Sequence, residues 1–390
     1  MYKIYLSFAL SLFCVQSNAQ NINFDAELAF ASKHLLNACK AYNDTVNAIP
    51  RTAKPDGTFK GTPSWDWTSG FFGGNLWYAY EATGNKELLP YAQKWTNAVW
   101  KEQYTTNNHD VGFMIYCSYG NMYRLTKDKN LPKVIVQAAK SLCTRFNPTV
   151  GCIQSWDGGG WNPFNFPVII DNMMNLELLF EATKLSKDST YWKIAVIHAN
   201  TTLKNHFRED GSSYHVVDYM KNDGSVRNKT TFQGLSYRSA WARGQGWGLY
   251  GYTLCYRYTK NSVYLEHAKK IAAFWMNHKN LPTDLIPYWD LDAPGNSCSP
   301  RDASAAALVA SALLELSTYT GDEGKKYKEF ALKTLASLAT DEYKAKLGEN
   351  NHFIIKHCTG AYPFNSEIDV PLVYADYYYL EALLRAKRMR

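Results

Sequence analysis

Two consecutive segments decide the fold: GFFGGNLWYAYEATG (residues 70–84) and KELLPYAQKWTNAV (residues 86–99). The second segment carries apolar residues at positions i, i+3, i+4 and i+7 and a basic outer face, which is the period of a helix with one solvated side. The first is bulky and aromatic and ends in a polar turn, as expected of a helix that lies inside the molecule. Together they predict a hairpin with an inner and an outer helix.

The same pair of segments recurs along the chain. Further inner-type segments are residues 112–128, 172–188, 244–261 and 303–322, and further outer-type segments are residues 131–142, 191–203, 263–275 and 325–338. An opening helix near 24–41 and a closing helix near 370–387 bring the total to about twelve helices. Self-similar helix hairpins indicate a repeat architecture. We predict an all-α fold, a six-hairpin (α/α)6 barrel, as a single domain over residues 20–390.

Composition narrows the class of protein. The chain has 390 residues, of which 46% are hydrophobic, 20% are charged and 15% are aromatic, with a formal net charge of +7. These values exclude a disordered chain, a coiled coil and a small disulfide scaffold. No run of Lys and Arg is dense enough to indicate a nucleic-acid partner. Aromatic faces with polar tips suit both a core and a wet groove that stacks ring-shaped ligands.

The first residues have the layout of a cleaved secretory signal. Lys3 precedes an apolar stretch over residues 4–15, and small residues follow at 17–19, which is the pattern of a signal peptide and too short to span a bilayer. We expect residues 1–19 to be removed and the protein to be exported, as to a periplasm, with no membrane partner. Seven cysteines follow this segment; Cys143 and Cys152 could close a short loop, but buried free thiols are favoured for most.

Long connections should gather on one face of the barrel. Each runs from the end of an outer segment to the start of the next inner one, and they span residues 50–67, 146–167, 207–239, 281–300 and 342–369. Loops on a rigid scaffold are the usual place for a binding site.

Carboxylates stand where several inner segments begin, namely Asp110, Asp171, Asp302 and Asp369. Asp is a favoured N-cap, which is the plain structural explanation for any one of them. Asp171 differs because it follows Pro-Val-Ile-Ile (residues 167–170), an apolar wall that would raise its pKa and suit it to general acid catalysis. Asp110 would supply a second carboxylate of the kind that glycosidic chemistry uses. His109 either orients Asp110 or lies at the surface.

The densest polar and aromatic stretch covers residues 214–247. His215, Gln233 and Arg243 offer donors, and Trp241 and Trp247 offer flat faces for sugar rings. The alternative is that the tryptophans belong to the inner wall and that Arg243 pairs structurally with an Asp.

A glycine-rich run, Trp-Asp-Gly-Gly-Gly-Trp (residues 156–161), begins at Trp156. It lacks the Lys-Ser/Thr of a phosphate loop and is better interpreted as a ring-stacking loop.

Six segments resemble the unsaturated glucuronyl hydrolases of glycoside hydrolase family 88. They are WDWTSGFFGGNLWYAYE (65–81), HDVGFM (109–114), IIDNMMNLELL (169–179), SAWARGQGWGLYGYT (239–253), RDASAAALVASALLEL (301–316) and EIDVPLVYADYYYLEALLR (367–385). The resemblance implies an (α/α)6 barrel that acts on oligosaccharides carrying a 4,5-unsaturated uronate at the non-reducing end. It also implies hydration of that double bond, with no metal or cofactor.

The resemblance also assigns residues. It implies that Asp171 is the general acid and base, protonating C4 and then activating water for attack at C5, and that Asp110 is the second essential carboxylate. The candidate substrate-binding residues are His109, Trp156, His215, Thr231, Gln233, Trp241, Arg243 and Trp247. The partner expected is an anionic oligosaccharide, and the sequence does not distinguish a monomer from a homodimer.

Three alternatives stay open at this point. An unsaturated rhamnogalacturonyl hydrolase would share the fold and chemistry but act on pectin fragments. An inverting glycosidase on the same barrel would use two carboxylates and a water at the anomeric carbon. A non-catalytic periplasmic glycan-binding protein would explain the tryptophans without requiring Asp171. The stretch 356–363, where the family contacts the neighbouring sugar, has only one lysine and no serine, which weakly disfavours a sulfate pocket there.

Overall fold

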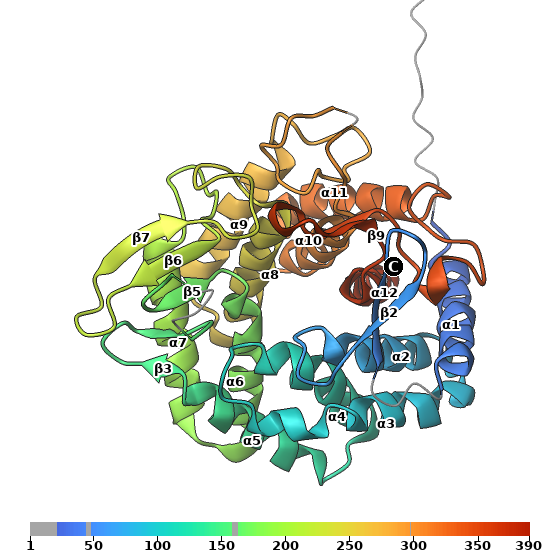
Figure 1. The fold of residues 1–390 in the computed structure, drawn as a ribbon, viewed down its shortest axis with the longest axis horizontal. Coiled ribbons are helices and arrows are strands. Elements are labelled where there is room, and N and C mark those ends of the chain that lie inside the picture. Colours follow the sequence, from blue (N-terminus) through green and yellow to red (C-terminus); the bar gives the residue numbers. More distant parts are fainter. Residues whose placement is uncertain (1–21, 44–47, 158–162, 297) are drawn as a thin grey trace, which may run out of the picture.

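The aromatic segments form a closed inner ring in a computed structural model, which describes residues 22–43, 48–157, 163–296 and 298–390 (Figure 1). The inner helices are α2 (Ser69–Thr83), the π-helical stretch η3 (Gly112–Gly120) with its continuation α4 (Asn121–Thr126), α6 (Asn172–Ser186), α8 (Ala242–Thr259), α10 (Ala303–Ser317) and α12 (Val373–Arg388). Each packs against the next, and α12 contacts α2 and so closes the ring.

The amphipathic segments form the outer layer. The outer helices are α1 (Phe24–Ala41), α3 (Leu89–Asn97), α5 (Leu131–Cys143), α7 (Ser189–Asn205), α9 (Ser262–Met276) and α11 (Gly324–Leu338). In α5, Val134, Ile135 and Ala138 are buried, whereas Lys133 and Lys140 are exposed. The predicted (α/α)6 barrel is confirmed, and the expected helices agree with the observed ones within a few residues at most ends.

Four inner helices end in the same way. Gly84, Lys127, Lys187 and Lys260 each follow the last helical residue in the left-handed conformation, with φ between 56° and 67°, and each donates its backbone N–H to the carbonyl four residues earlier. This C-cap turns the chain back toward the outer layer. The repeat is therefore present in backbone geometry as well as in hydrophobic pattern.

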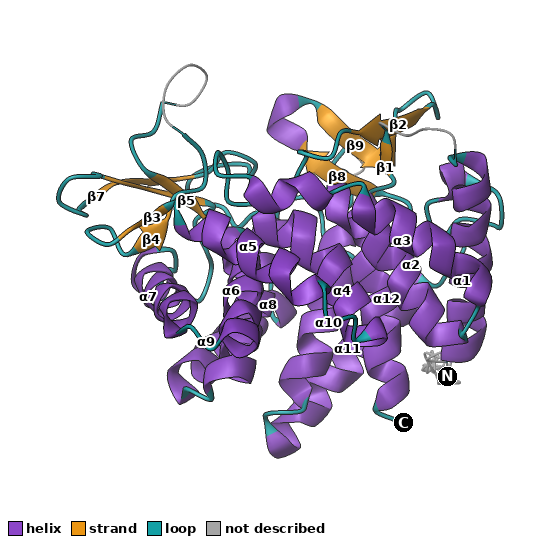
Figure 2. Ribbon diagram, turned by 90° about the horizontal axis from the view of Figure 1, so that it is seen from below, coloured by secondary structure: helices purple, strands orange, loops and turns teal. Residues whose placement is uncertain are grey.

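Within the described residues, four small antiparallel sheets lie on one face of the ring (Figure 2). The strands are β1 (Ile49–Ala53) with β2 (Phe59–Thr62), β3 (Phe146–Asn147) with β4 (Cys152–Ile153), β5 (Pro167–Ile169) with β6 (Val216–Tyr219) and β7 (Val226–Thr230), and β8 (Cys358–Ala361) with β9 (Ser366–Val370). All of them lie within or beside the predicted long connections. The gathering of those connections on one face is confirmed, and short strands organise them.

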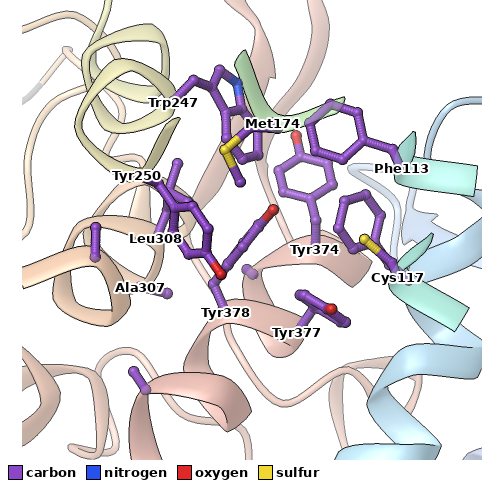
Figure 3. Close-up of a cluster of buried hydrophobic side chains, with 14 of the residues drawn as sticks. Phe113, Cys117, Met174, Trp247, Tyr250, Ala307, Leu308, Tyr374, Tyr377 and Tyr378 are labelled. Atoms are coloured by element: carbon purple, nitrogen blue, oxygen red, sulfur yellow. The ribbon is translucent and has the colours of Figure 1, made fainter. Parts of the chain in front are cut away.

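The middle of the barrel is filled with aromatic rings. Tyr374, Tyr377 and Tyr378 of α12 meet Phe113 of η3 and Trp247 of α8 in one cluster (Figure 3). The ring of Trp247 lies 5.2 Å from that of Phe113 and 5.5 Å from that of Tyr378. Much of the aromatic excess is therefore inner-wall packing, which gives the site a rigid floor.

Glycines let the inner helices approach one another closely. A Cβ at Gly70 of α2 would lie 2.3 Å from the carbonyl oxygens of Phe113 and Met114 in η3, and one at Gly74 would lie 2.5 Å from the carbonyl oxygen of Cys117. These contacts fix α2 against the helix that follows Asp110.

The cysteines of the described residues are all free, and five of the seven are buried. Cys143 and Cys152 are not bonded to each other, in agreement with the favoured prediction. None of the described helices has the length and apolar character needed to cross a membrane. The predicted signal segment, residues 1–19, lies outside the described residues.

Candidate active site

Asp171 directly precedes α6 and is separated by Ile170 alone from β5, a strand of one of the small sheets. Its side chain forms no capping hydrogen bond, although Asp188 and Asp302 do cap their helices. The Asp171 side chain is almost buried, and its Oδ2 atom has no hydrogen-bond partner among the described residues. A buried carboxyl oxygen that does not serve the helix is available for chemistry.

Burial raises the pKa of Asp171 from 3.8 to about 7. The positive charge of Arg243 and the indole N–H of Trp247 favour the ionised form and limit that rise. The apolar wall expected from the sequence is present, since Val168, Ile169 and Ile170 are buried. A carboxyl group with a pKa near neutrality can donate a proton and then accept one.

Asp110 precedes the π-helical stretch η3, a rare backbone form that often occurs at functional sites. Burial raises the pKa of Asp110 well above 3.8, and the nearby charges of Asp171 and Asp66 raise it further. His109 is buried, with its Nε2 atom 3.4 Å from Asp110 Oδ1, and burial lowers the pKa of this imidazole to about 3. His109 therefore lies against Asp110 as a neutral side chain and is not at the surface.

Asn175 joins the two carboxylate segments. Its Oδ1 atom accepts a hydrogen bond of 3.0 Å from the backbone N–H of Phe113, and a Cβ at Gly112 would lie 2.6 Å from the same oxygen. One turn after Asp171, α6 thus holds the start of η3 just after Asp110. The close contact explains why residue 112 is a glycine, and the hydrogen bond explains why residue 175 is an asparagine.

His215 faces Asp171 in a defined tautomer. Its Nδ1 atom accepts from the backbone N–H groups of Phe232 at 3.0 Å and Gln233 at 3.1 Å. Burial lowers the pKa of His215 well below 6.5, so the ring is neutral and its proton is on Nε2. Nε2 lies 3.7 Å from Asp171 Oδ2 and is itself a buried donor without a partner in the described structure.

Trp247 and Trp241 both belong to the buried wall of the site. Trp247 is fully buried, and its indole N–H faces Asp171 but forms no hydrogen bond of ordinary geometry with the described residues. Trp241 is 4% exposed, lies 4.6 Å from the His215 ring and is covered by the Arg243 guanidinium at 4.7 Å. Both indoles pack as inner wall, as the structural alternative predicted, and contact between them and a sugar ring stays a prediction.

Arg243 is held in a buried ion pair. Its Nη1 atom donates to Asp302 Oδ2 at 2.7 Å and to the carbonyl of Thr359, and its Nη2 atom donates to the carbonyl of Gly360. The Gly360 carbonyl also accepts from Gln233 Nε2 at 3.3 Å. The structural pairing left open by the sequence is therefore present, and Arg243 acts on Asp171 through its charge.

Trp156 lies at the outer side of the site. Its ring is partly exposed and lies 6.3 Å from that of His215 and 5.4 Å from that of Phe232. Thr231, in the loop after β7, accepts a hydrogen bond from the backbone N–H of Gly234 and so shapes that loop. The remainder of the glycine-rich run, residues 158–162, lies outside the described residues.

Two aromatic residues of this site were not among the predicted binding residues. Trp67 packs against Tyr374 at 4.9 Å and Phe113 at 5.5 Å, and Tyr374 in turn lies below the Arg243 guanidinium at 5.3 Å. The Trp-Asp-Trp run at 65–67 was the available signal for Trp67. Asp369 does not begin a helix: it lies in β9 and pairs with His357 at 2.6 Å.

Among the described residues, no group of three or more His, Cys, Asp or Glu side chains is arranged to hold a metal ion. The site thus brings together two coupled carboxylates, two neutral histidines and buried donors on a tryptophan-rich wall. This is an arrangement for proton transfer on a ring-shaped substrate.

Comparison with known proteins agrees with that chemistry. The profile of Glycosyl Hydrolase Family 88 matches residues 38–387. The chain belongs to this family. It is 50% identical over 347 residues to an unsaturated glucuronyl hydrolase of Formosa agariphila, covering 88% of this chain and 86% of that protein. It is 32% identical over 347 residues to an unsaturated chondroitin disaccharide hydrolase of Streptococcus agalactiae, covering 86% and 85%.

Solved structures of family 88 enzymes share the whole fold. A crystal structure of an unsaturated glucuronyl hydrolase specific for heparin superposes with a TM-score of 0.91 at 52% identity, over 94% of this chain and 97% of that chain. The unsaturated glucuronyl hydrolase of Bacillus sp. GL1 superposes with a TM-score of 0.86 at 30% identity, over the same shares. The predicted family and enzyme class are confirmed, and the glucuronyl hydrolase prediction holds over the three alternatives.

Proposed function

We propose that this enzyme removes the 4,5-unsaturated uronate from the non-reducing end of oligosaccharides that a polysaccharide lyase has produced. The observation that carries the proposal is Asp171: a buried carboxyl with a pKa of about 7, beside unpaired donors on His215 and Trp247 and coupled to Asp110. Membership of family 88 supports the same reaction.

The proposed reaction adds water across the C4=C5 double bond. Protonated Asp171 gives its proton to C4, and the charge that develops at C5 is shared with the ring oxygen. Asp171, now ionised, takes a proton from the water whose oxygen bonds to C5, and so returns to its starting state. The hemiketal formed at C5 opens to a ketone, and the exposed hemiacetal at C1 releases the remaining sugar.

The surrounding residues support this role. Neutral His215 presents an Nε2–H toward Asp171 and can orient the carboxyl or bind a sugar oxygen without adding a competing base. Asp110, with neutral His109 beside it, is placed to accept hydrogen bonds from sugar hydroxyls. The buried positive charge of Arg243 offsets the negative charge that a uronate brings to two neighbouring carboxyl groups.

The polysaccharide that supplies the substrate is the next question, and it must contain uronate. Relatives are described as acting on heparin or on chondroitin disaccharides, so we propose unsaturated disaccharides of glycosaminoglycan type as the first substrates to test. A panel of lyase products from heparin, chondroitin, hyaluronan and plant or algal uronans, followed by loss of the ultraviolet absorbance of the conjugated double bond, measures the preference. Saturated disaccharides of the same sugars are the control. Cleavage of the saturated controls, or no loss of absorbance with any member of the panel, would contradict the proposed reaction.

We also propose that residues 1–19 direct export and are then removed, on the basis of the apolar stretch and the small residues at 17–19. N-terminal sequencing of the protein from a periplasmic or culture fraction tests this. A mature chain that begins at Met1 in the cytoplasmic fraction would contradict it.

A further inference from the structure

Arg51 of β1 lies between two carboxylates, Asp66 at the end of its own connection and Glu367 from β9. Its Nε and Nη2 atoms donate to the two oxygens of Glu367 in β9 at 2.6 and 2.9 Å, and its Nη1 atom donates to Asp66 Oδ1 at 2.7 Å. The three side chains are only 15%, 6% and 17% exposed. Burial opposes the charge of Arg51, yet the two carboxylates raise the pKa of its guanidinium. One cation therefore joins both ends of the connection 50–67 to β9, which lies more than 300 residues further along the chain.

One branch of this network leads to Arg243. Glu367 packs against the backbone of Gly360, where a Cβ would lie 2.6 Å from Glu367 Oε2 and 2.7 Å from Glu367 Cβ. The carbonyl of Gly360 accepts hydrogen bonds from both Arg243 and Gln233. The position of Glu367, which Arg51 holds at two oxygens, therefore limits where that carbonyl and its two donors can lie.

The other branch leads to the aromatic wall and to Asp110. Asp66 Oδ1 also accepts from the backbone N–H of Thr68 at 2.9 Å, which fixes the turn that presents Trp67 to Tyr374. The charge of Asp66 is one of those that raise the pKa of Asp110. The other charged groups that face Asp110 are Asp171, which acts in the same direction, and Arg145, which opposes it, with neutral His109 alongside.

We propose that Arg51 is a positioning residue for the reaction, tying the Asp66 turn to β9 and neutralising two carboxylates that would otherwise repel an anionic substrate. The only other cation on Glu367 among the described contacts is Lys60, which is 3.7 Å away and 45% exposed, so water screens it more strongly. The bidentate contact with Glu367 matches the planar guanidinium, and a lysine ammonium cannot reproduce it. This inference rests on the proposed function, because it assumes that a uronate enters the site.

The test uses four variants of the full chain: Arg51→Met, Arg51→Lys, Asp66→Asn and Glu367→Gln. We expect Arg51→Met to raise KM for an unsaturated disaccharide on the order of tenfold, with a smaller change in kcat, because uncompensated negative charge repels the substrate. Arg51→Lys should fall between Arg51→Met and the wild type. Asp66→Asn and Glu367→Gln remove a negative charge but keep an amide oxygen that can accept from Arg51, so KM should stay unchanged or fall.

The pH dependence of kcat/KM distinguishes an electrostatic role of Arg51 from a purely structural one. The apparent pKa values of the coupled carboxylates should move up in Arg51→Met and down in Asp66→Asn and Glu367→Gln. A purely structural role would not shift them in opposite directions. If Arg51→Met does not fold, Arg51→Lys and the two carboxylate variants still decide the direction of the shifts.

Two results distinguish a failure of the proposed role of Arg51 from a failure of the proposed enzymatic function. If the wild type consumes unsaturated disaccharides but the variants change only the melting temperature, with KM and the pH profile unmoved, the role of Arg51 is wrong and the function stands. A wild type that consumes none of the lyase products overturns the proposed function and this inference with it.

Discussion

The Asp171→Asn variant should lose activity and gain stability, and the gain should depend on pH. Burial raises the pKa of Asp171 from 3.8 to about 7, so the unfolded chain releases this proton more easily than the folded one. Below pH 3.8 both the folded and the unfolded state hold the proton, so the carboxyl does not lower the free energy of unfolding. Between pH 3.8 and 7 the free energy of unfolding falls by about 1.4 kcal/mol for each pH unit, and above pH 7 it falls no further on account of this group.

The magnitude follows from those two pKa values. From pH 5 to pH 8 the cost of keeping Asp171 grows by roughly 3 kcal/mol, because the loss continues up to pH 7 and then stops. An Asn amide also loses hydration in the buried site, but this loss is the same at both pH values. The advantage of Asp171→Asn over the wild type should therefore be greater by roughly 3 kcal/mol at pH 8, or about 4 °C in Tm for a chain of this length.

The assay compares unfolding of the two proteins at pH 5 and pH 8, together with turnover of an unsaturated disaccharide by loss of ultraviolet absorbance. Asp188→Asn is the matched control, since Asp188 caps α7 at the surface and hydrogen bonds to Thr190 lower its pKa. The control variant should be no more stable than the wild type at either pH. An equal gain for Asp171→Asn at both pH values, or near-normal turnover, would refute the reasoning that this carboxyl is a proton donor held protonated by burial.

Three further outcomes are expected. First, kcat/KM of the wild type should fall above about pH 7, approaching tenfold for each pH unit, because ionised Asp171 cannot protonate C4; a profile flat to pH 9 would contradict this. Second, Asp302→Asn should lower the free energy of unfolding by about 3–5 kcal/mol, because it leaves the Arg243 charge buried and unpaired. Asp322→Asn, which breaks an exposed pair with Lys325, should change it by less than about 0.5 kcal/mol in the same denaturant titration. Third, Lys187→Gly should raise stability by about 1 kcal/mol, because Lys187 has a φ of 66°. Lys184→Gly, inside α6, should lower it by about 1 kcal/mol, and the opposite order would contradict the C-cap assignment.

The barrel could be predicted from the sequence because its hairpins repeat one local pattern. The contrast between aromatic inner segments and amphipathic outer ones fixed both the helices and the face on which the long connections meet. Asp171 could also be singled out, since the apolar run before it lies next to it in sequence. Its elevated pKa agrees with that local argument.

The rest of the site depends on contacts between distant segments. Whether Arg243 is free or paired depends on Asp302, 59 residues away, and on the carbonyls of β8. The tautomer of His215 is set by backbone groups of the loop after β7. The link from Arg51 to Glu367 spans 316 residues. No periodicity or spacing encodes such pairs, because their partners come together only in the folded chain.

That closure depends on α12, which packs between α10 and α2 and meets α1. Until this helix docks, the inner wall is an open, curved surface that exposes its aromatic rings to water. Tyr374 and the strands that hold Arg243 lie in this last part of the barrel, so the pocket cannot form in advance of the ring. Joining helices from the two ends of a long chain is a slow, non-local step. We therefore expect the protein to be most prone to aggregate in the interval before α12 is in place.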